Sequence, residues 1–301
     1  MGTFLGHFVP GLAFAILGMW HALNTVKTYK LKGSSGFRAA AWFPFPSPLP
    51  GLKHLELYLL LSFSVLAIVD QLVDLPLLSF SIQPDALEHA TMYLHLALYA
   101  SVALAADAVA SSHHGAQLGE VVAALAASVF GQELFLLRFH SADHAGLEGH
   151  YHWLLQLVVT ASFVSTSATV VLPRSFAVAV VRSASVLFQG LWFIVMGFAL
   201  WVPALVPRGC HGVTSDGDAM RSAVACPTDE AARRAVVMAN LQFSWVLAAV
   251  WVVTAYLCLR VGESRSMEYR QLQAPSSSDV GALAGDGDAT QKRVFPVSDN
   301  V

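Results

Sequence analysis

Long apolar runs alternate with short polar connections along almost the whole chain. Each run is near or above the roughly 20 residues that a helix needs to cross a bilayer. The runs are continuously apolar and rich in Ala and Leu, whereas a membrane barrel would show shorter segments that alternate between two faces. The pattern therefore predicts an all-α fold, a polytopic membrane bundle of seven transmembrane helices. The expected spans are 4–24, 54–74, 88–110, 117–138, 151–172, 177–202 and 236–260.

The composition also indicates a membrane protein. Hydrophobic residues make up 55% of the chain and charged residues 12%, and the mean hydropathy is +0.58, which is too apolar for an ordinary soluble domain. The lipid bilayer is thus the first expected partner. A net charge of -3 without a basic face gives no indication of nucleic-acid binding. We expect a transmembrane domain over residues 1–262 and, from its polar composition, a disordered cytosolic tail over 263–301.

Basic residues in the connections predict the orientation. Lys27, Lys30 and Lys32 follow the first span, and Arg260 and Arg265 follow the last. Seven spans place these two segments on the same side, which the positive-inside rule makes cytosolic. The N-terminus is then lumenal or extracellular, in the endomembrane system or the plasma membrane. The predicted lumenal loop at about 203–235 opposes the rule, because it contains Arg208, Arg221, Arg233 and Arg234.

A cysteine pair in one connection and a tyrosine motif in the tail are two short features of interest. Cys210 and Cys226 lie in the predicted lumenal loop, where an oxidising compartment permits a disulfide. Two unrelated thiols are the alternative. Tyr269 and Leu272 have the spacing of a tyrosine-based sorting signal close to the membrane, and its partner would be a sorting adaptor. So short a pattern also occurs by chance.

One connection gathers most of the residues that could carry chemistry. Its polar side chains recur at every fourth position, which on a continuous helix would form one stripe. Gly146 and Gly149 make an unbroken helix doubtful, so the stretch is also compatible with a short loop between the fourth and fifth spans. The recurring residues are His140, His144, Glu148, His152 and Gln156.

The predicted topology places the histidines that open the third span on the same side as this stretch. Ionisable groups are costly in hydrocarbon and are default candidates for function. Imidazole and carboxylate ligands suit zinc or non-haem iron, and an open coordination position would activate water or oxygen. Without an HExxH motif or a cysteine pair, a hydrogen-bonded network that pins helix ends together is the competing interpretation. The candidate metal ligands are His89, His95, Glu133, His140, His144 and His152.

Short motifs spread over about residues 1–260 carry a family resemblance. They comprise Met1, Gly2, Phe4, Gly6, His7, Pro10, Gly11, Leu55, Glu56, His89, Thr91, Met92, Tyr93, Glu133, His140, His144, His152, Leu154, Leu155, Arg182, Ser183, Gln189, Gly190, Trp192 and Phe193. With these residues the chain resembles the transmembrane protein 45 family, also described as domain of unknown function 716. The glycine-rich run from Glu148 to His152 looks like the plant branch. The resemblance implies a seven-span protein of the endomembrane system or cell surface and transfers no catalytic role.

Three classes of function remain open. The first is a structural, trafficking or binding component of the membrane without enzymatic activity. The second is a metal-dependent membrane enzyme that acts on a lipid or another hydrophobic substrate through the histidine and carboxylate residues. The third is a proton-coupled carrier in which Glu133, His140 and His144 relay protons. A carrier would more naturally show broken helices and a site at the midplane of the membrane.

Overall fold

The computed structural model describes residues 3–73, 84–109, 115–140, 146–213 and 223–273. At some helix ends, His140 among them, and beyond residue 261 it describes the backbone alone. The chain divides into two compact units, Met1–Val261 and Gly262–Val301. All side-chain contacts below belong to the first unit.

Helices account for nearly all of the described residues, which confirms the predicted all-α class. Two short 3₁₀ helices and one pair of two-residue strands are the other regular elements among the described residues, and irregular connections join them. In chain order the elements are α1 (Phe4–Gly36), η1 (Pro50–His54), α2 (Leu55–Val73), α3 (Pro84–Val109), α4 (Gly115–His140), α5 (Gly146–Val171), α6 (Phe176–Trp201), η3 (Pro203–Leu205), β1 (His211–Gly212), β2 (Val224–Ala225) and α7 (Asp229–Gln273).

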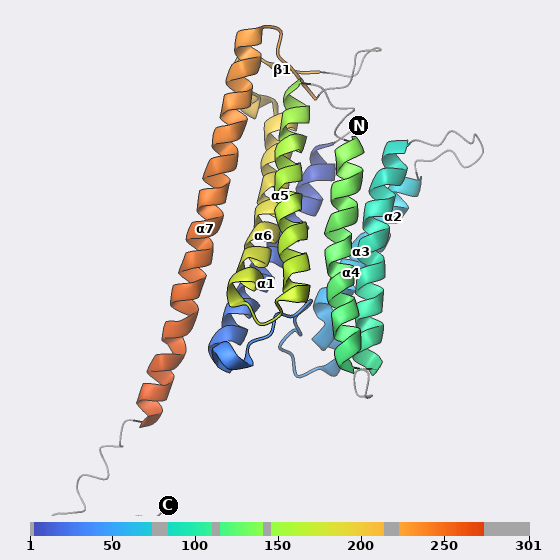
Figure 1. Ribbon diagram of the computed structural model, residues 1–301. Coiled ribbons are helices and arrows are strands. Elements are labelled where there is room, and N and C mark those ends of the chain that lie inside the picture. Colours follow the sequence, from blue (N-terminus) through green and yellow to red (C-terminus); the bar gives the residue numbers. More distant parts are fainter. Residues whose placement is uncertain (1–2, 74–83, 110–114, 141–145, 214–222, 274–301) are drawn as a thin grey trace, which may run out of the picture. The chain divides into compact units, whose positions relative to one another are not determined.

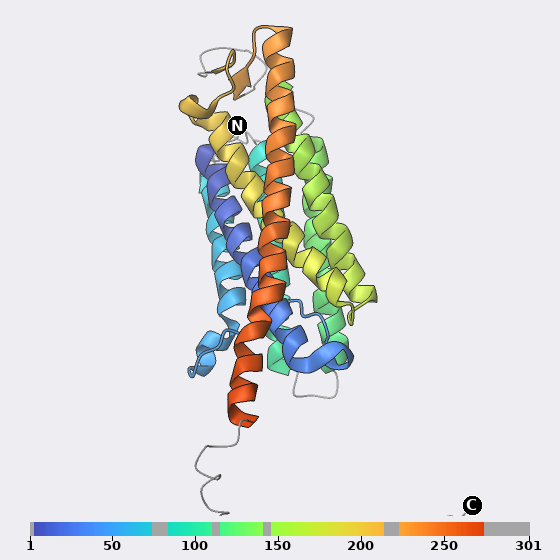
Figure 2. The same cartoon turned by 90° about the vertical axis from the view of Figure 1, so that its left-hand side faces the viewer.

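Six of the helices enclose a common interior. Their packing order is α1, α6, α5, α4, α3 and α2, and hydrogen bonds from Trp20 and His21 in α1 to Glu56 in α2 join the first and last of these helices. Helix α7 lies outside this group, as Figures 1 and 2 both show. Its Phe243 packs against Phe188 and Trp192 of α6, with ring centroids 4.8 and 5.1 Å apart.

The closest helix packing is between α1 and α6, where three glycines face the partner helix. A Cβ added to Gly190 would lie 2.2 Å from the backbone nitrogen of Ala15, and one added to Gly18 would lie 2.3 Å from that of Leu187. A Cβ on Gly11 would meet the carbonyl oxygen of Gly190 at 3.0 Å. Small residues permit this approach, which van der Waals contact then stabilises in a membrane.

The strand pair lies near the start of α7 and is tied to α5. Cys210 and Cys226 form a disulfide with an S–S distance of 2.06 Å, next to the antiparallel pairing of β1 with β2. The backbone N–H of Ala223 donates to Glu148 Oε2 at 2.6 Å. The carboxylate of Glu148 therefore fastens this loop to the first turn of α5.

Several helices extend beyond the apolar runs that predict them. Helix α1 continues through Lys27, Lys30 and Lys32, because a helix need not end where the hydrocarbon does, and it is interrupted at Gly33, whose φ is +70°, before it ends at Gly36. Helix α7 begins at Asp229, where Thr228 Oγ1 accepts from the backbone of Ala231, and its backbone continues to Gln273, beyond the predicted end of the transmembrane domain. Of the predicted disordered tail, 263–301, residues 274–301 lie outside the described residues.

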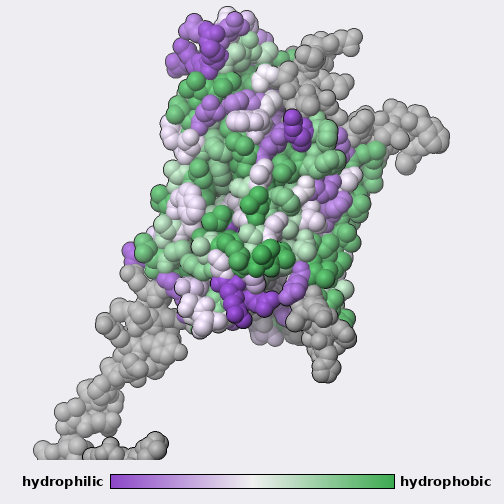
Figure 3. Space-filling model, viewed as in Figure 1, coloured by the Kyte–Doolittle hydropathy of each residue, from purple (hydrophilic) through white to green (hydrophobic). Residues whose placement is uncertain are grey.

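Among the described residues, seven helices are long and apolar enough to cross a membrane. On the face shown in Figure 3, hydrophobic residues cover much of the helical surface, and strongly hydrophilic ones gather chiefly toward its two ends. Exposed large side chains such as Leu66, Trp245, Val252 and Leu259 belong to this outward surface. Such a surface is stable only in contact with lipid or detergent.

Candidate functional site

A cavity of about 100 Å³ lies among α1 to α6, toward the end of the bundle at which α1 begins. We call it the inner cavity. Its polar lining comes from four helices and consists of His7, His89, Tyr93, Glu133 and His152, and its apolar lining includes Phe14, Phe63, Leu96, Val129 and Phe193. Ionisable side chains from separate helices therefore face one enclosed space.

Glu133 is the only carboxylate that lines the inner cavity among the residues described. It is 8% exposed and accepts a hydrogen bond from Gln189 Nε2 at 2.8 Å. No described cationic side chain forms an ion pair with it. The other amide atom of Gln189, Oε1, is buried and accepts no hydrogen bond from the described residues. A buried carboxylate held by one amide is costly unless water or a ligand completes its hydrogen bonds.

Two histidines of the inner cavity have their tautomers set by the helix backbone. His7 Nδ1 lies 3.0 Å from the carbonyl oxygen of Thr3, and His152 Nδ1 lies 2.9 Å from that of Glu148. A carbonyl oxygen only accepts, so Nδ1 carries a proton in both rings. The two rings pack edge to face, with centroids 5.7 Å apart.

A second buried cluster lies toward the opposite end of the bundle and joins α1, α2 and α6. Glu56 accepts from Trp20 Nε1 at 2.8 Å and from the backbone N–H of Phe43 at 2.9 Å. His21 Nε2 lies 2.8 Å from Glu56 Oε1, and its Nδ1 lies 3.3 Å from Arg182 Nη2. A guanidinium only donates, so Nδ1 accepts and Nε2 donates to Glu56. The tautomer of His21 is thus fixed by its two charged neighbours.

The connection after α1 crosses this end of the bundle as an irregular strap, which we define as residues 37–43. Consecutive residues of the strap are held by different elements. Ala39 N–H donates to Pro173 O, Arg182 Nη2 donates to Ala40 O, and Tyr99 Oη donates to Ala41 O, at 2.7, 2.8 and 2.8 Å. The strap therefore closes the interior at this end by hydrogen bonds from α3, α6 and the turn after α5.

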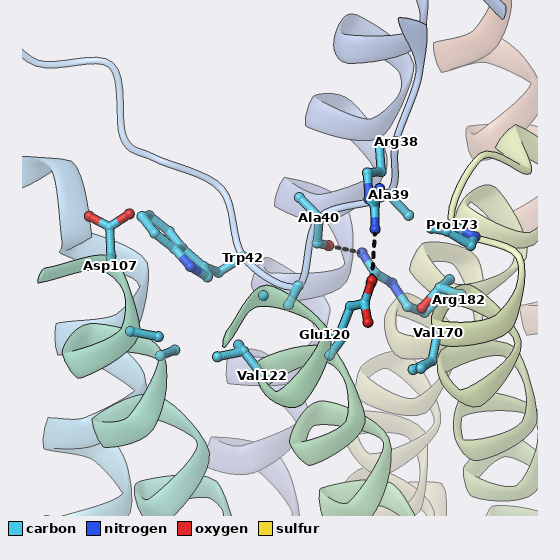
Figure 4. Close-up of a pocket in the computed structure, with 16 residues that line it drawn as sticks. Arg38, Ala39, Ala40, Trp42, Asp107, Glu120, Val122, Val170, Pro173 and Arg182 are labelled. Atoms are coloured by element: carbon cyan, nitrogen blue, oxygen red, sulfur yellow. Dashed lines mark hydrogen bonds and ion pairs between the residues drawn. The ribbon is translucent and has the colours of Figure 1, made fainter. Parts of the chain in front are cut away.

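Two further cavities meet at the strap. The larger, which we call the vestibule, has a volume of about 460 Å³. Figure 4 shows Arg182, Arg38 and Glu120 around it, with Trp42 and Asp107 on another side. The smaller, the middle cavity, has a volume of about 60 Å³ and is lined by the second buried cluster. Ala41 and Arg182 line both of these cavities.

The middle cavity also adjoins the inner cavity. Phe14, Leu96 and Val129 line both of them. The vestibule, the middle cavity and the inner cavity thus follow one another through the interior of the six helices. Neighbouring cavities have lining side chains in common.

The structure brings together some of the predicted metal ligands. His89, Glu133 and His152 line the inner cavity, whereas His95 lines none of the three cavities and its Nδ1 lies 3.0 Å from the carbonyl of Thr91. His140 ends α4, and α5 begins at Gly146 with φ +64°, so the stripe of polar residues is broken between two helices. The side chains of His140 and His144 lie outside the described residues, as do those of the sorting-signal residues Tyr269 and Leu272.

The described part of the chain does not assemble a metal centre. It contains no group of three or more His, Cys, Asp or Glu side chains arranged to hold an ion. Zinc or non-haem iron therefore stays a prediction that depends on His140 and His144, and we assign no reaction step to a metal.

Two histidines of α1 belong to the polar interior, although each lies near an end of the predicted first span. His7 lines the inner cavity and is 7% exposed, and His21 is buried in the second cluster. Glu56, near the start of α2, is likewise buried. The signal was present in the spacing, because His7, Gly11, Gly18 and His21 share one face of α1 and the two glycines make the contact with α6.

The fold and the site together define a class: an integral multi-pass helical membrane protein with a row of polar cavities inside it. A family model described as "Family of unknown function (DUF716)" matches residues 119–259, from α4 to α7. The match supports the resemblance to domain of unknown function 716. The transmembrane protein 45 name and the plant branch stay predictions.

Proposed function

We propose that this protein is a membrane carrier for a small polar solute. One observation carries the proposal: three consecutive cavities share lining residues through the interior of the bundle. Ionisable residues inside membrane segments usually mark substrate, ion or proton pathways. Here such residues line all three cavities, from Arg182 in the vestibule to Glu133 in the inner cavity.

The cavity volumes favour a small polar solute over a lipid. A water molecule takes about 30 Å³ of liquid volume, so the middle cavity holds about two waters and the inner cavity about three. Pockets for drug-sized ligands span roughly 300–1,000 Å³, a range that among the three cavities only the vestibule reaches. An enzyme for hydrophobic substrates would need a larger apolar chamber beside Glu133 and His152.

The closure at the strap favours a carrier over an open channel. The middle cavity is narrow, and the His21, Glu56 and Arg182 cluster lies between the vestibule and the inner cavity. Passage therefore requires the strap or the helices to move, as in alternating access. The strap contains no helix and is held by hydrogen bonds together with the buried rings of Phe37 and Phe43. Opening would exchange those hydrogen bonds for bonds to water, at a modest net cost for each, and would expose the two rings.

The predicted orientation completes the proposal. The vestibule lies beside the α1–α2 connection, which the positive-inside rule assigns to the cytosol. Solute would enter or leave the vestibule on the cytosolic side of the endomembrane system or the plasma membrane. We further propose that transport of the solute is coupled to protons, and that Glu133 is one of the residues that bind the proton.

Cysteine accessibility tests the proposal without knowledge of the solute. Leu96 lines both the middle and the inner cavity, so a Leu96→Cys variant in a Cys258→Ser background reports opening of the interior. A carrier in proteoliposomes should let a membrane-impermeant methanethiosulfonate reach this thiol from either side, more slowly than it reaches an exposed Arg174→Cys. A thiol at Val252, on the outer face of α7, should not react.

The competing structural role predicts a different result. A closed bundle would leave Leu96→Cys unlabelled from both sides while Arg174→Cys reacts fully, and this outcome would end the carrier proposal. Coupling is tested separately with a pH-sensitive dye inside the liposomes. Solute movement that ignores an imposed pH gradient would remove the proton from the mechanism and leave the carrier in place.

A further inference from the structure

Arg182 has more hydrogen-bond donors than the protein uses. The side chain is 5% exposed, and Nη2 makes its only described contacts, to Ala40 O and His21 Nδ1. The Nε and Nη1 groups donate to no described residue. No carboxylate among these residues forms an ion pair with the guanidinium, although it lines the vestibule. A buried guanidinium without a carboxylate is unusual, because its charge and its planar set of donors both require a partner.

The acids around the vestibule already have cationic partners. Glu120 pairs with Arg38 at 3.4 Å, and Asp107 pairs with Lys53 at 2.6 Å and with His54 at 2.8 Å. Glu56, behind the ring of His21, accepts hydrogen bonds from Trp20, His21 and the backbone of Phe43, and it interacts with Arg182 only electrostatically, without direct contact. Arg182 thus has no carboxylate in direct contact among the described residues, and its Nε and Nη1 groups donate to none of them.

The vestibule has the space for an anion beside Arg182. Much of its wall is formed by short side chains: Ala39, Ala40, Ala41, Ala103, Ala106 and Ala123. Their size leaves a volume of about 460 Å³, and Trp42 contributes a flat apolar face. Figure 4 shows the Arg182 side chain reaching toward the strap at this space.

We infer that the vestibule binds a small oxyanion, a carboxylate or phosphate group, in contact with the Nε and Nη1 groups of Arg182. A guanidinium matches the two oxygens of such a group in a bidentate pair. The group belongs either to a free organic anion or to a lipid headgroup at the same interface. The inference rests on the proposed carrier in one respect, since it names the class of solute, but binding itself needs no transport.

Two arms of one binding experiment separate the sources. In the first, the full chain in uncharged maltoside detergent is titrated by calorimetry with succinate and with inorganic phosphate. In the second, its melting temperature is compared in phosphatidylcholine nanodiscs with and without phosphatidic acid. Binding in the first arm identifies a free anion, and stabilisation in the second arm alone identifies a headgroup.

Three variants test the role of Arg182. Arg182→Lys keeps the charge but loses the bidentate pair, and it should raise Kd by about tenfold or more. Ala123→Leu fills the vestibule while it leaves Arg182 in place, and it should weaken binding similarly. Arg174→Gln removes an exposed cation that does not line the vestibule, and it should leave Kd unchanged.

Specific results would overturn the inference. Absence of binding in both arms does so, and so does binding that Arg174→Gln weakens as much as Arg182→Lys. If Arg182→Lys fails to fold, Ala123→Leu decides, because an unchanged Kd in that variant would place the anion elsewhere. The two proposals can fail separately. If the anion binds but the Leu96→Cys thiol is never labelled, the oxyanion site stands and the carrier proposal is refuted.

Discussion

The contact between α1 and α6 gives the sharpest test of the packing. Gly190→Ala adds one methyl group at the point of closest approach. The new Cβ would lie 2.2 Å from the nitrogen of Ala15 and 2.6 Å from the carbonyl oxygen of Gly11. Both are backbone atoms, so no side-chain rotation relieves the clash. The two helices must separate, or the variant must unfold.

The expected cost follows from the geometry. Ordinary Cβ contacts begin at 3.4 Å, so the backbone must move by more than an ångström along a well-packed surface. Overpacking of this kind costs about 1–3 kcal/mol. A destabilisation of that size lowers the melting temperature by about 2–12 °C for a domain of this length. Separation would also stretch the contact between His21 on α1 and Arg182 on α6.

Gly119→Ala is the matched control, because a Cβ at this position in α4 meets nothing within 4 Å. There the substitution changes helix propensity alone, which favours Ala over Gly by up to about 1 kcal/mol. Thermal unfolding of both purified variants in the same detergent, followed by circular dichroism, gives the comparison. Gly119→Ala should melt at or above the native temperature and Gly190→Ala well below it.

The result that refutes this reasoning is a Gly190→Ala protein that melts with the native chain. It would mean that α1 and α6 are not in backbone contact at this position. Gly18→Ala provides a second reading from the opposite helix, because its Cβ would meet the backbone of Leu187 at 2.3 Å. The two substitutions should therefore destabilise to a similar extent.

Three further predictions follow from the site residues. Non-reducing mass mapping of material from an intact secretory pathway should recover Cys210 and Cys226 in one cross-linked peptide, and two free thiols there would contradict the disulfide. If the metal hypothesis holds, purified protein should contain stoichiometric zinc or iron that a His140→Ala, His144→Ala double variant loses, whereas metal-free protein of unchanged stability removes the hypothesis. If the sorting signal is active, Tyr269→Ala should raise the share of protein at the cell surface in a biotinylation assay, and an unchanged distribution would show that the motif is accidental.

The candidate site was only partly predictable from the sequence. His89, Glu133 and His152 stood out because ionisable residues are rare in apolar runs, and all three line the inner cavity. His7, His21 and Glu56 lie near the ends of the predicted spans, and in the sequence alone this position is equally typical of side chains at the membrane interface. Depth along a helix does not determine which way a side chain faces, and all three face the interior.

The surroundings of Arg182 were also not predictable from the sequence. Its position seven residues before Gln189 was visible in the sequence, and so was its place within an apolar run. Its relation to the strap was not, because residues 37–43 are far from it in the chain and carry no motif. The hydrogen bond to Ala40 O uses a backbone carbonyl, a group that every residue has and no sequence pattern distinguishes.

The sequence by itself determined the class of fold. Seven apolar runs of spanning length leave helices as the only structures that satisfy every backbone N–H and C=O group in hydrocarbon, and those helices are present among the described residues. Only the tertiary structure decided which polar residues share a cavity. That outcome depends on the rotation of each helix and on its neighbours, which are set by close contacts such as Gly190 against Ala15. These contacts join residues far apart in the chain, so the local pattern that predicts each helix contains no information about them.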